Sequence, residues 1–233
     1  DPGENRWFDS VAECGARHGI PTFAPPDVNH PLWVHRIRQV EPDIIFSFFY
    51  RTLLRRAILD IPLHGCLNLH PSLLPAYRGR CPINWVLVNG ETETGVTLHH
   101  MTPRPDDGDI VAQRRIPIAP DDTARSLHEK AASAAADLLD EALPRVKDGT
   151  APRTPQDPGK ASYLGGRRPE DGEISWPSGA AASRNLVRAV TRPYPGAFSH
   201  AGDHRCFFWQ VTEVTPPAPG GMPGDVLTTD PFV

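Results

Sequence analysis

One short segment, residues 67–79, contains side chains that can carry protons and stabilise charge. Asn68 and His70 are two positions apart, so on an extended chain their side chains point to the same side. An imidazole titrates near neutral pH and can carry a proton, while a carboxamide can donate a hydrogen bond to an oxyanion. These are two of the three groups that acyl transfer to an amine needs, and the third is a group that orients the imidazole.

A carboxylate from elsewhere in the chain would hold the imidazole in one orientation and favour its protonated form. The best candidate is Asp106, in the stretch Arg104-Pro105-Asp106-Asp107-Gly108. Taken alone, a Pro-Asp-Asp-Gly stretch is usually a surface turn, and an Asn-x-His pair is more often structural than catalytic. The ordered combination of Asn68, His70 and Asp106, with a proline-framed loop after the first two, favours catalysis.

The elements around these residues predict an open α/β sheet. A continuous apolar run at residues 43–48 is typical of a buried parallel strand, and residues 65–70 are expected to form another short strand. Helical spacing covers residues 7–17, 31–39, 52–59, 82–88 and 123–146, with Asn29 as a capping residue, and further strands are expected at 20–24, 95–99 and 110–113. Asn68 and His70 then lie where a buried strand ends, which is where such sheets bind ligands.

A linker rich in proline and glycine, residues 149–166, divides the chain. We expect a catalytic domain over residues 1–165. Residues 166–233 would form a helix at 180–190 and the start of a small, incomplete β-rich domain, OB-like, with strands at 197–200, 205–211 and 225–227.

Composition excludes several classes of function. The net charge of −4 provides no positive field for nucleic acid. The four cysteines form no Cys-x-x-Cys pair, which fits a reducing cytoplasm and argues against a zinc site. No apolar run approaches the roughly 18 to 20 residues that span a bilayer. His99 and His100 are adjacent on a predicted strand and face opposite sides, so we expect no metal site there.

The motif Asn-x-His-Pro-Ser-x-x-Pro-x-Tyr-Arg-Gly, followed by Gly-x-Thr and Asp-x-Gly, resembles the folate-dependent formyltransferases. Within that family the chain is most similar to the formyltransferase domain of UDP-4-amino-4-deoxy-L-arabinose formyltransferases, from Asp1–Phe8 to Arg188-Ala189-Val190. The resemblance implies a Rossmann-like α/β fold. It also implies that Asn68 stabilises the transition state, that His70 is the general acid and base, and that Asp106 raises the pKa of His70.

The resemblance further implies 10-formyltetrahydrofolate as the formyl donor, with no metal. It places the folate-binding residues in two loops and at one cation, namely Thr52, Leu53, Leu54, Arg80, Thr102, Pro103, Arg104, Pro105 and Asp106. By the same comparison, the first strand, first helix and second strand of the sheet are expected to be missing before Asp1. The chain is then either a stand-alone sugar enzyme or fused to a decarboxylating dehydrogenase domain, and a homo-oligomer stays open.

The acceptor implied by the resemblance is the amine of a UDP-linked amino-sugar, for lipid A or surface polysaccharide modification. A methionyl-tRNA formyltransferase is the first alternative, and the negative net charge counts against it. A non-catalytic module that binds folate or a nucleotide-sugar is the second, and the presence of all three catalytic residue types counts against it. For Arg78 and Arg80, solvated cations and anion binding both stay open, and Trp85 is expected to pack in the core.

Overall fold

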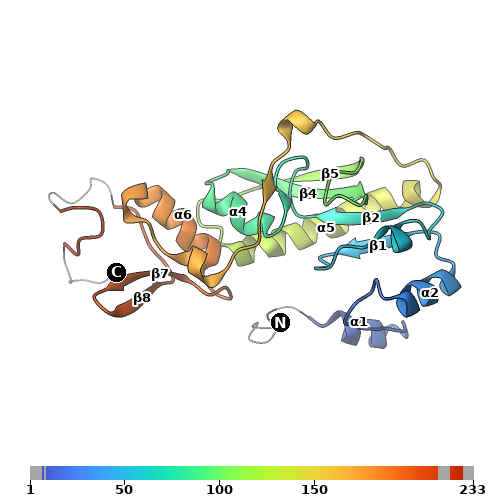
Figure 1. Ribbon diagram of the computed structural model, residues 1–233. Helices are drawn as coiled ribbons and strands as arrows, with labels where there is room; N and C mark the ends of the chain where they lie inside the picture. The colour runs from blue at the N-terminus through green and yellow to red at the C-terminus, as the bar shows by residue number, and fades with distance from the viewer. Residues whose placement is uncertain (1–6, 8, 215–220, 228–233) are drawn as a thin grey trace.

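The computed structural model describes residue 7 and residues 9–214 and 221–227, and a four-stranded mixed sheet lies at its centre (Figure 1). The strand order is β1-β2-β4-β5, where the strands are β1 (Ile45–Phe48), β2 (Cys66–His70), β4 (Glu93–His100) and β5 (Ile110–Pro117). β1 and β2 are parallel, and β4 is antiparallel to both of its neighbours. Three of the four strands therefore run in the same direction, and the predicted Rossmann-like α/β class is confirmed.

The central strand β2 is apolar on one face and carries the candidate catalytic residues on the other. Leu67 and Leu69 are 1% and 4% exposed and belong to the main hydrophobic core. The register pairs Asn68 with His99 on β4, while His70 is opposite Thr97. This register brings His99, which follows Asn68 by 31 positions, next to the predicted site.

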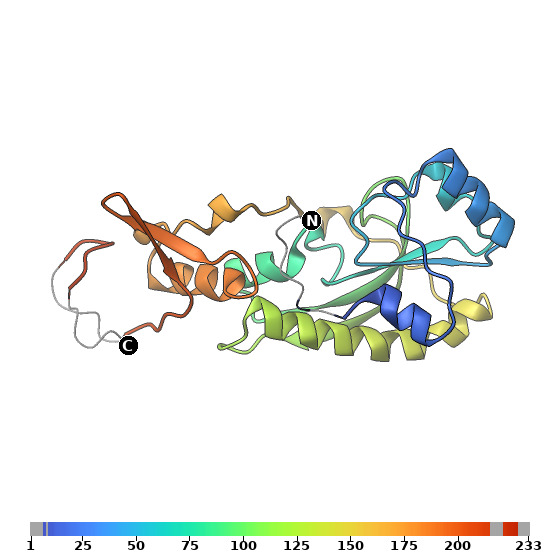
Figure 2. The ribbon, with the colours of Figure 1, turned by 90° about the horizontal axis from the view of Figure 1, so that it is seen from below.

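The longest helix, α5 (Ala124–Lys147), lies along one face of the sheet (Figure 2). Its first turn is fixed by a capping box, in which Thr123 and Ser126 each accept a hydrogen bond from the other's backbone N–H. Its buried stripe, with Leu127 and Leu138, packs against β4 and β5. Burial of each such leucine contributes about 1.5–3 kcal/mol, so this face holds the sheet rigid beneath the site.

A second, smaller core holds the segments before and after β1. α2 (Pro31–Val40) and α3 (Arg56–Leu59) pack together through Val34, Leu54 and Ile58. His30 caps α2 with its ring nitrogen, so the expected Asn29 cap is wrong. The helix expected over residues 52–59 is limited to α3, which leaves residues 51–55 as a loop. The remaining helix on this side is α1 (Val11–Arg17), which has no buried residue.

The chain after α5 runs back over the sheet towards the other end of the molecule (Figure 1). It contains β6 (Tyr163–Leu164), which pairs with β3 (Arg78–Gly79), and three short 3-10 turns, Pro158–Lys160, Pro169–Gly172 and Trp176–Ser178. α6 (Ala180–Val190) then packs on α4 (Pro82–Val88), and β7 (Ala197–Ala201) forms a hairpin with β8 (His204–Phe208).

Two strand predictions are wrong. Residues 20–24 and 225–227 have no ladder partner within the described ranges, because the short apolar runs that suggested strands meet no sheet edge there. The expected loop at Asp1–Phe8 lies outside the described residues, apart from Trp7. The division into domains at residues 165 and 166 stays a prediction. Of the helices in the described part of the chain, none combines the length and apolar character needed to cross a bilayer.

Candidate active site

Asn68, His70 and Asp106 converge where β2 ends. Oδ1 of Asp106 lies 3.6 Å from Nδ1 of His70 and 3.4 Å from Nδ2 of Asn68. All three side chains line one cavity of about 500 Å³. The structure therefore brings together the three residues that the sequence singled out, although Asp106 comes from the loop between β4 and β5, more than 30 positions away.

The imidazole of His70 is held in one tautomer by the backbone. Its Nε2 lies 2.8 Å from the carbonyl oxygen of Tyr77. A carbonyl can only accept, so Nε2 carries the hydrogen and donates it. Nδ1 is then the atom that gains or loses a proton, and it is the ring nitrogen that faces Asp106.

Burial lowers the pKa of His70 below its usual 6.5, since the side chain is almost completely enclosed. The charge of Asp106 and the Tyr77 carbonyl raise the pKa of His70, but burial together with His99 outweighs them. His70 is therefore neutral at neutral pH, with Nδ1 free to accept a proton. Asp106 acts in the direction that the resemblance implied, and its contribution offsets part of the burial effect.

Asp106 is held as an anion by donors around it. Burial alone would raise the pKa of its carboxyl group, but the His99 and His70 rings in their protonated forms, together with the Gly79 N–H, lower that pKa below its usual value. The Gly79 N–H donates to Oδ2 at 2.9 Å. Asp106 has a φ of 56°, a left-handed conformation that aspartate tolerates better than most residues.

His99 is a member of the site that the sequence did not indicate. It is 1% exposed, and its Nδ1 donates to the carbonyl of His100 at 2.9 Å. In the neutral ring Nε2 is then an acceptor, and it takes a hydrogen bond from Nδ2 of Asn68 at 3.1 Å. One amide hydrogen of Asn68 is thus committed to His99, while the other makes only a long contact with Asp106 and can turn to an oxyanion in the cavity.

The predicted folate-binding residues surround the same cavity, with one exception. It is lined by Thr52, Leu53, Leu54, Arg80, Thr102, Arg104 and Pro105, whereas Pro103 lines the two neighbouring hollows instead. The loop at residues 52–54 is held by Asn29, whose amide accepts from Arg55 N at 2.8 Å and donates to Leu53 O at 3.0 Å. The sequence analysis expected Asn29 to cap a helix, whereas the structure shows that it holds this loop.

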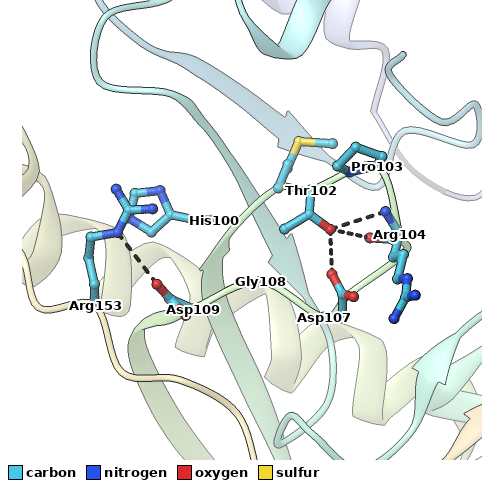
Figure 3. A pocket seen from close by; sticks show the side chains of 9 residues that line it. His100, Thr102, Pro103, Arg104, Asp107, Gly108, Asp109 and Arg153 are labelled. Carbon is cyan, nitrogen blue, oxygen red and sulfur yellow. Dashed lines mark hydrogen bonds and ion pairs between the residues drawn. The ribbon is translucent and has the colours of Figure 1, made fainter. Parts of the chain in front are cut away.

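The loop that carries Asp106 is braced from its other side (Figure 3). The Thr102 hydroxyl bonds the Asp107 carboxylate and the backbone of Arg104, and Arg153 forms an ion pair with Asp109 at 3.6 Å. The residues that make these contacts line a hollow of about 470 Å³ on that side. In the part of the chain that the structure describes, no group of three or more His, Cys, Asp or Glu side chains could hold a metal ion.

The two arginines of the motif have different surroundings. Arg78 is only 6% exposed and bonds Gln156 and Tyr163, so it is not free for a ligand anion. Arg80 is exposed at the rim of the cavity, which Arg51 and Arg104 also line. Trp85 is half-buried, with its Nε1–H on the carbonyl of Gly165 and the Arg167 guanidinium 4.6 Å from its ring centre. Its ring face is therefore covered by Arg167.

Residues 14–143 match the formyl transferase family, and residues 167–231 match the C-terminal domain of formyl transferases. The first match alone covers more than half of the 233 residues. The chain therefore belongs to the formyl transferase family, and it is a folate-dependent N-formyltransferase enzyme.

Solved structures share the fold at low sequence identity. A sugar N-formyltransferase from a Shewanella species is 21% identical with a TM-score of 0.70, over 85% of this chain and 80% of that one. A methionyl-tRNA formyltransferase from Clostridium thermocellum is 20% identical with a TM-score of 0.67, over 84% and 82%. HypX from Aquifex aeolicus in complex with tetrahydrofolic acid is 23% identical with a TM-score of 0.62, over 73% of this chain but 29% of that protein.

Proposed function

We propose that this enzyme transfers a formyl group from 10-formyltetrahydrofolate to the amine of a UDP-linked amino-sugar, such as UDP-4-amino-4-deoxy-L-arabinose. The observation that carries this proposal is the convergence of Asn68, His70 and Asp106 on one cavity, with Nδ1 of His70 free to accept a proton. The donor supplies the formyl carbon when it is bound. The similarity to a sugar N-formyltransferase and to a protein that binds tetrahydrofolic acid supports the choice of substrates.

The cavity fits a flat, partly polar ligand. Two loops border it, at residues 52–54 and 102–106, and their backbone groups can bond a pterin ring while Arg80 offers a charge to a carboxylate. The cavity volume of about 500 Å³ lies within the usual range for small-molecule sites, roughly 300–1,000 Å³. We assign the folate site to these loops, with Pro103 at its edge, where it lines the two neighbouring hollows.

Each catalytic residue has one task in the proposed reaction. The unprotonated amine attacks the formyl carbon, and Nδ1 of His70 receives the proton that the amine loses. The second amide hydrogen of Asn68 stabilises the oxyanion. Asp106 stabilises the imidazolium that forms. The same proton then passes from His70 to the folate nitrogen as the bond between that nitrogen and the formyl carbon breaks, and tetrahydrofolate leaves.

A substitution at His70 tests the proposal. The intact protein is assayed with 10-formyltetrahydrofolate and a UDP-linked amino-sugar, and formylated sugar is detected by mass spectrometry. His70→Asn places an amide near the position of Nδ1 but has no group that titrates near neutral pH, so turnover should fall about 100-fold or more. His35→Ala, which removes an exposed histidine from α2, is the matched control. Wild-type turnover in His70→Asn would contradict the assignment.

The same assay separates the alternatives. Formylation of methionyl-tRNA in place of the sugar would show a tRNA enzyme, a function that one solved relative has. That activity should weaken steeply as salt rises, because tRNA binding releases counterions. The net charge of −4 favours the sugar. Ligand binding without turnover of either acceptor would support a non-catalytic module. A part in lipid A or surface polysaccharide modification and a cytoplasmic location belong to the same proposal.

A further inference from the structure

The segment between α5 and α6 holds the two catalytic loops together. We call residues 154–164 the strap. At one end, Thr154 exchanges two backbone hydrogen bonds with Ile110, of 2.8 and 2.9 Å, at the start of β5. At the other end, the carbonyls of Ser162 and Leu164 accept from the N–H groups of Arg78 and Arg80 at 2.9 and 3.0 Å. The strap therefore joins the loop after β2 to the loop that carries Asp106.

Gln156 lies near the Thr154 end of the strap and uses its whole hydrogen-bonding capacity. Its Nε2 donates to the carbonyl of Asp106 at 2.9 Å and to the carbonyl of Gly108 at 2.7 Å. Its Oε1 accepts from Nε and Nη2 of Arg78 at 3.1 and 2.6 Å. The orientation of the amide is unambiguous, since only the NH2 group can face two carbonyls and only the oxygen can face a guanidinium.

Arg78 fixes Gln156 from the opposite side. Its third contact is from Nη1 to the Tyr163 hydroxyl at 3.0 Å, and its guanidinium lies 5.3 Å from the centre of that ring. Among the described residues no carboxylate forms an ion pair with Arg78. Burying a cation is unfavourable unless its donors are satisfied, so the observed neutral partners keep Arg78 in one place and, with it, the Gln156 oxygen.

These contacts close a ring of bonds around the Asp106 carboxylate. Gln156 holds the backbone of Asp106, whose left-handed φ of 56° is unfavourable for a residue with a side chain. Arg78 precedes Gly79, whose N–H holds the other end of the same residue at Oδ2. Both the backbone and the carboxylate of Asp106 are thereby tied to one arginine.

We propose that Gln156, held by Arg78, is a positioning residue that sets the distance between the Asp106 carboxylate and the His70 imidazole. Neither side chain needs to touch a substrate. The proposal rests on the proposed function for its kinetic consequence, but the distance that it concerns is a property of the protein alone. The groups that face His70 are Asp106 from the β4–β5 loop and His99 from β4, with the Tyr77 carbonyl at Nε2.

The test replaces Gln156 by leucine or asparagine in the intact protein. Leucine removes all four hydrogen bonds, and asparagine keeps the amide but is too short to reach both sides. We expect kcat to fall about 10- to 100-fold, since a displacement near 1 Å can cost about that much. KM for the acceptor should stay within about threefold, because the lost interaction is not with bound substrate. Lys160→Ala, at an exposed strap residue that only pairs with Asp157, is the matched control.

The decisive readout is the titration of His70, followed by NMR in the protein without substrate. The Asp106 carboxylate raises the pKa of His70, so a displaced carboxylate should move that titration to lower pH, with His99 followed in the same spectra. A merely structural role would lower thermal stability and turnover without moving it. If Gln156→Leu does not fold, Gln156→Asn provides the same measurement. A His70 titration at its wild-type pH in the folded variant overturns the proposal. Absence of sugar formylation by the wild type would instead contradict the proposed function, and the NMR titration of His70 would still test the role of Gln156.

Discussion

The charge of Asp106 can be removed with little change of shape by the substitution Asp106→Asn. Asparagine matches aspartate in size, tolerates a left-handed φ, and still offers an oxygen to the Gly79 N–H. Two unit charges 3.6 Å apart, the separation of Oδ1 and His70 Nδ1, attract by about 4–5 kcal/mol at an effective dielectric constant of about 20. His99 and local relaxation offset part of this, so we expect the pKa of His70 to fall in the variant.

The lower pKa of His70 should shift the pH dependence of the rate in one direction. The pKa of His70 already lies below its usual value because of burial, so the group is neutral at pH 7 in both proteins. The acid limb of the kcat/KM profile, where His70 becomes protonated, should move to lower pH in the variant. At pH 7 turnover should fall about 100-fold or more, because a less basic imidazole takes the amine proton less readily and its imidazolium has lost its counter-charge.

The assay combines the pH profile of sugar formylation with NMR titration of His70. The control is Asp109→Asn, at the end of the same loop. It removes the carboxylate that pairs with Arg153 and should leave the pH at which His70 titrates unchanged. A His70 pKa in Asp106→Asn that is equal to or above the wild-type value would refute the electrostatic role of Asp106, whatever happens to the activity.

Two further predictions concern the frame of the site. In Gly108→Ala, the new Cβ would lie 2.0 Å from the carbonyl oxygen of His100, so the loop must move. We expect a loss of about 1–3 kcal/mol in unfolding free energy, measured by denaturant titration, together with slower turnover in the formylation assay. Wild-type values in both measurements would contradict the packing argument. Asp122 bonds Lys130, Ser126 and Ala119 N, which outweigh the effect of burial and lower its pKa. The Asp122 carboxylate therefore contributes to stability above about pH 4, and this contribution is lost as pH falls below that value. Asp122→Asn should reduce the unfolding free energy at pH 7 and make that free energy fall less steeply in acid. Parallel curves of stability against pH for the two proteins would show that the lowered pKa is not coupled to folding.

Local sequence was sufficient for most of the helices and for the strand that carries the site. Three local patterns predict their elements, namely the stripe of α5, the apolar run at residues 43–48 and the apolar face of residues 65–70, because burial of such a face is decided within the segment itself. The same local logic failed at residues 20–24 and 225–227. A short apolar run becomes a strand only where another strand is within reach, and that is not a local property.

The candidate chemistry was visible because its residue types are unusual together and lie in a rigid, ordered motif. Asn68 and His70 share one side of β2 by the alternation of a strand, which sequence spacing determines. Asp106 was identified from its motif, but its separation of 3.6 Å from His70 depends on how the β4–β5 loop folds back.

Other members of the site depended on tertiary structure. His99 lies in the site because of the strand register, since a shift of one residue would have turned His99 to the opposite face of the sheet. Gln156 lies in a segment whose composition indicated only a linker, and its bonds to Asp106 and Arg78 join positions 50 and 78 residues apart. Residue types and spacing thus determined which residues are candidates for the chemistry. Three-dimensional packing decided which neighbours hold the reacting groups in place, because such contacts depend on distance in space and not on separation along the chain.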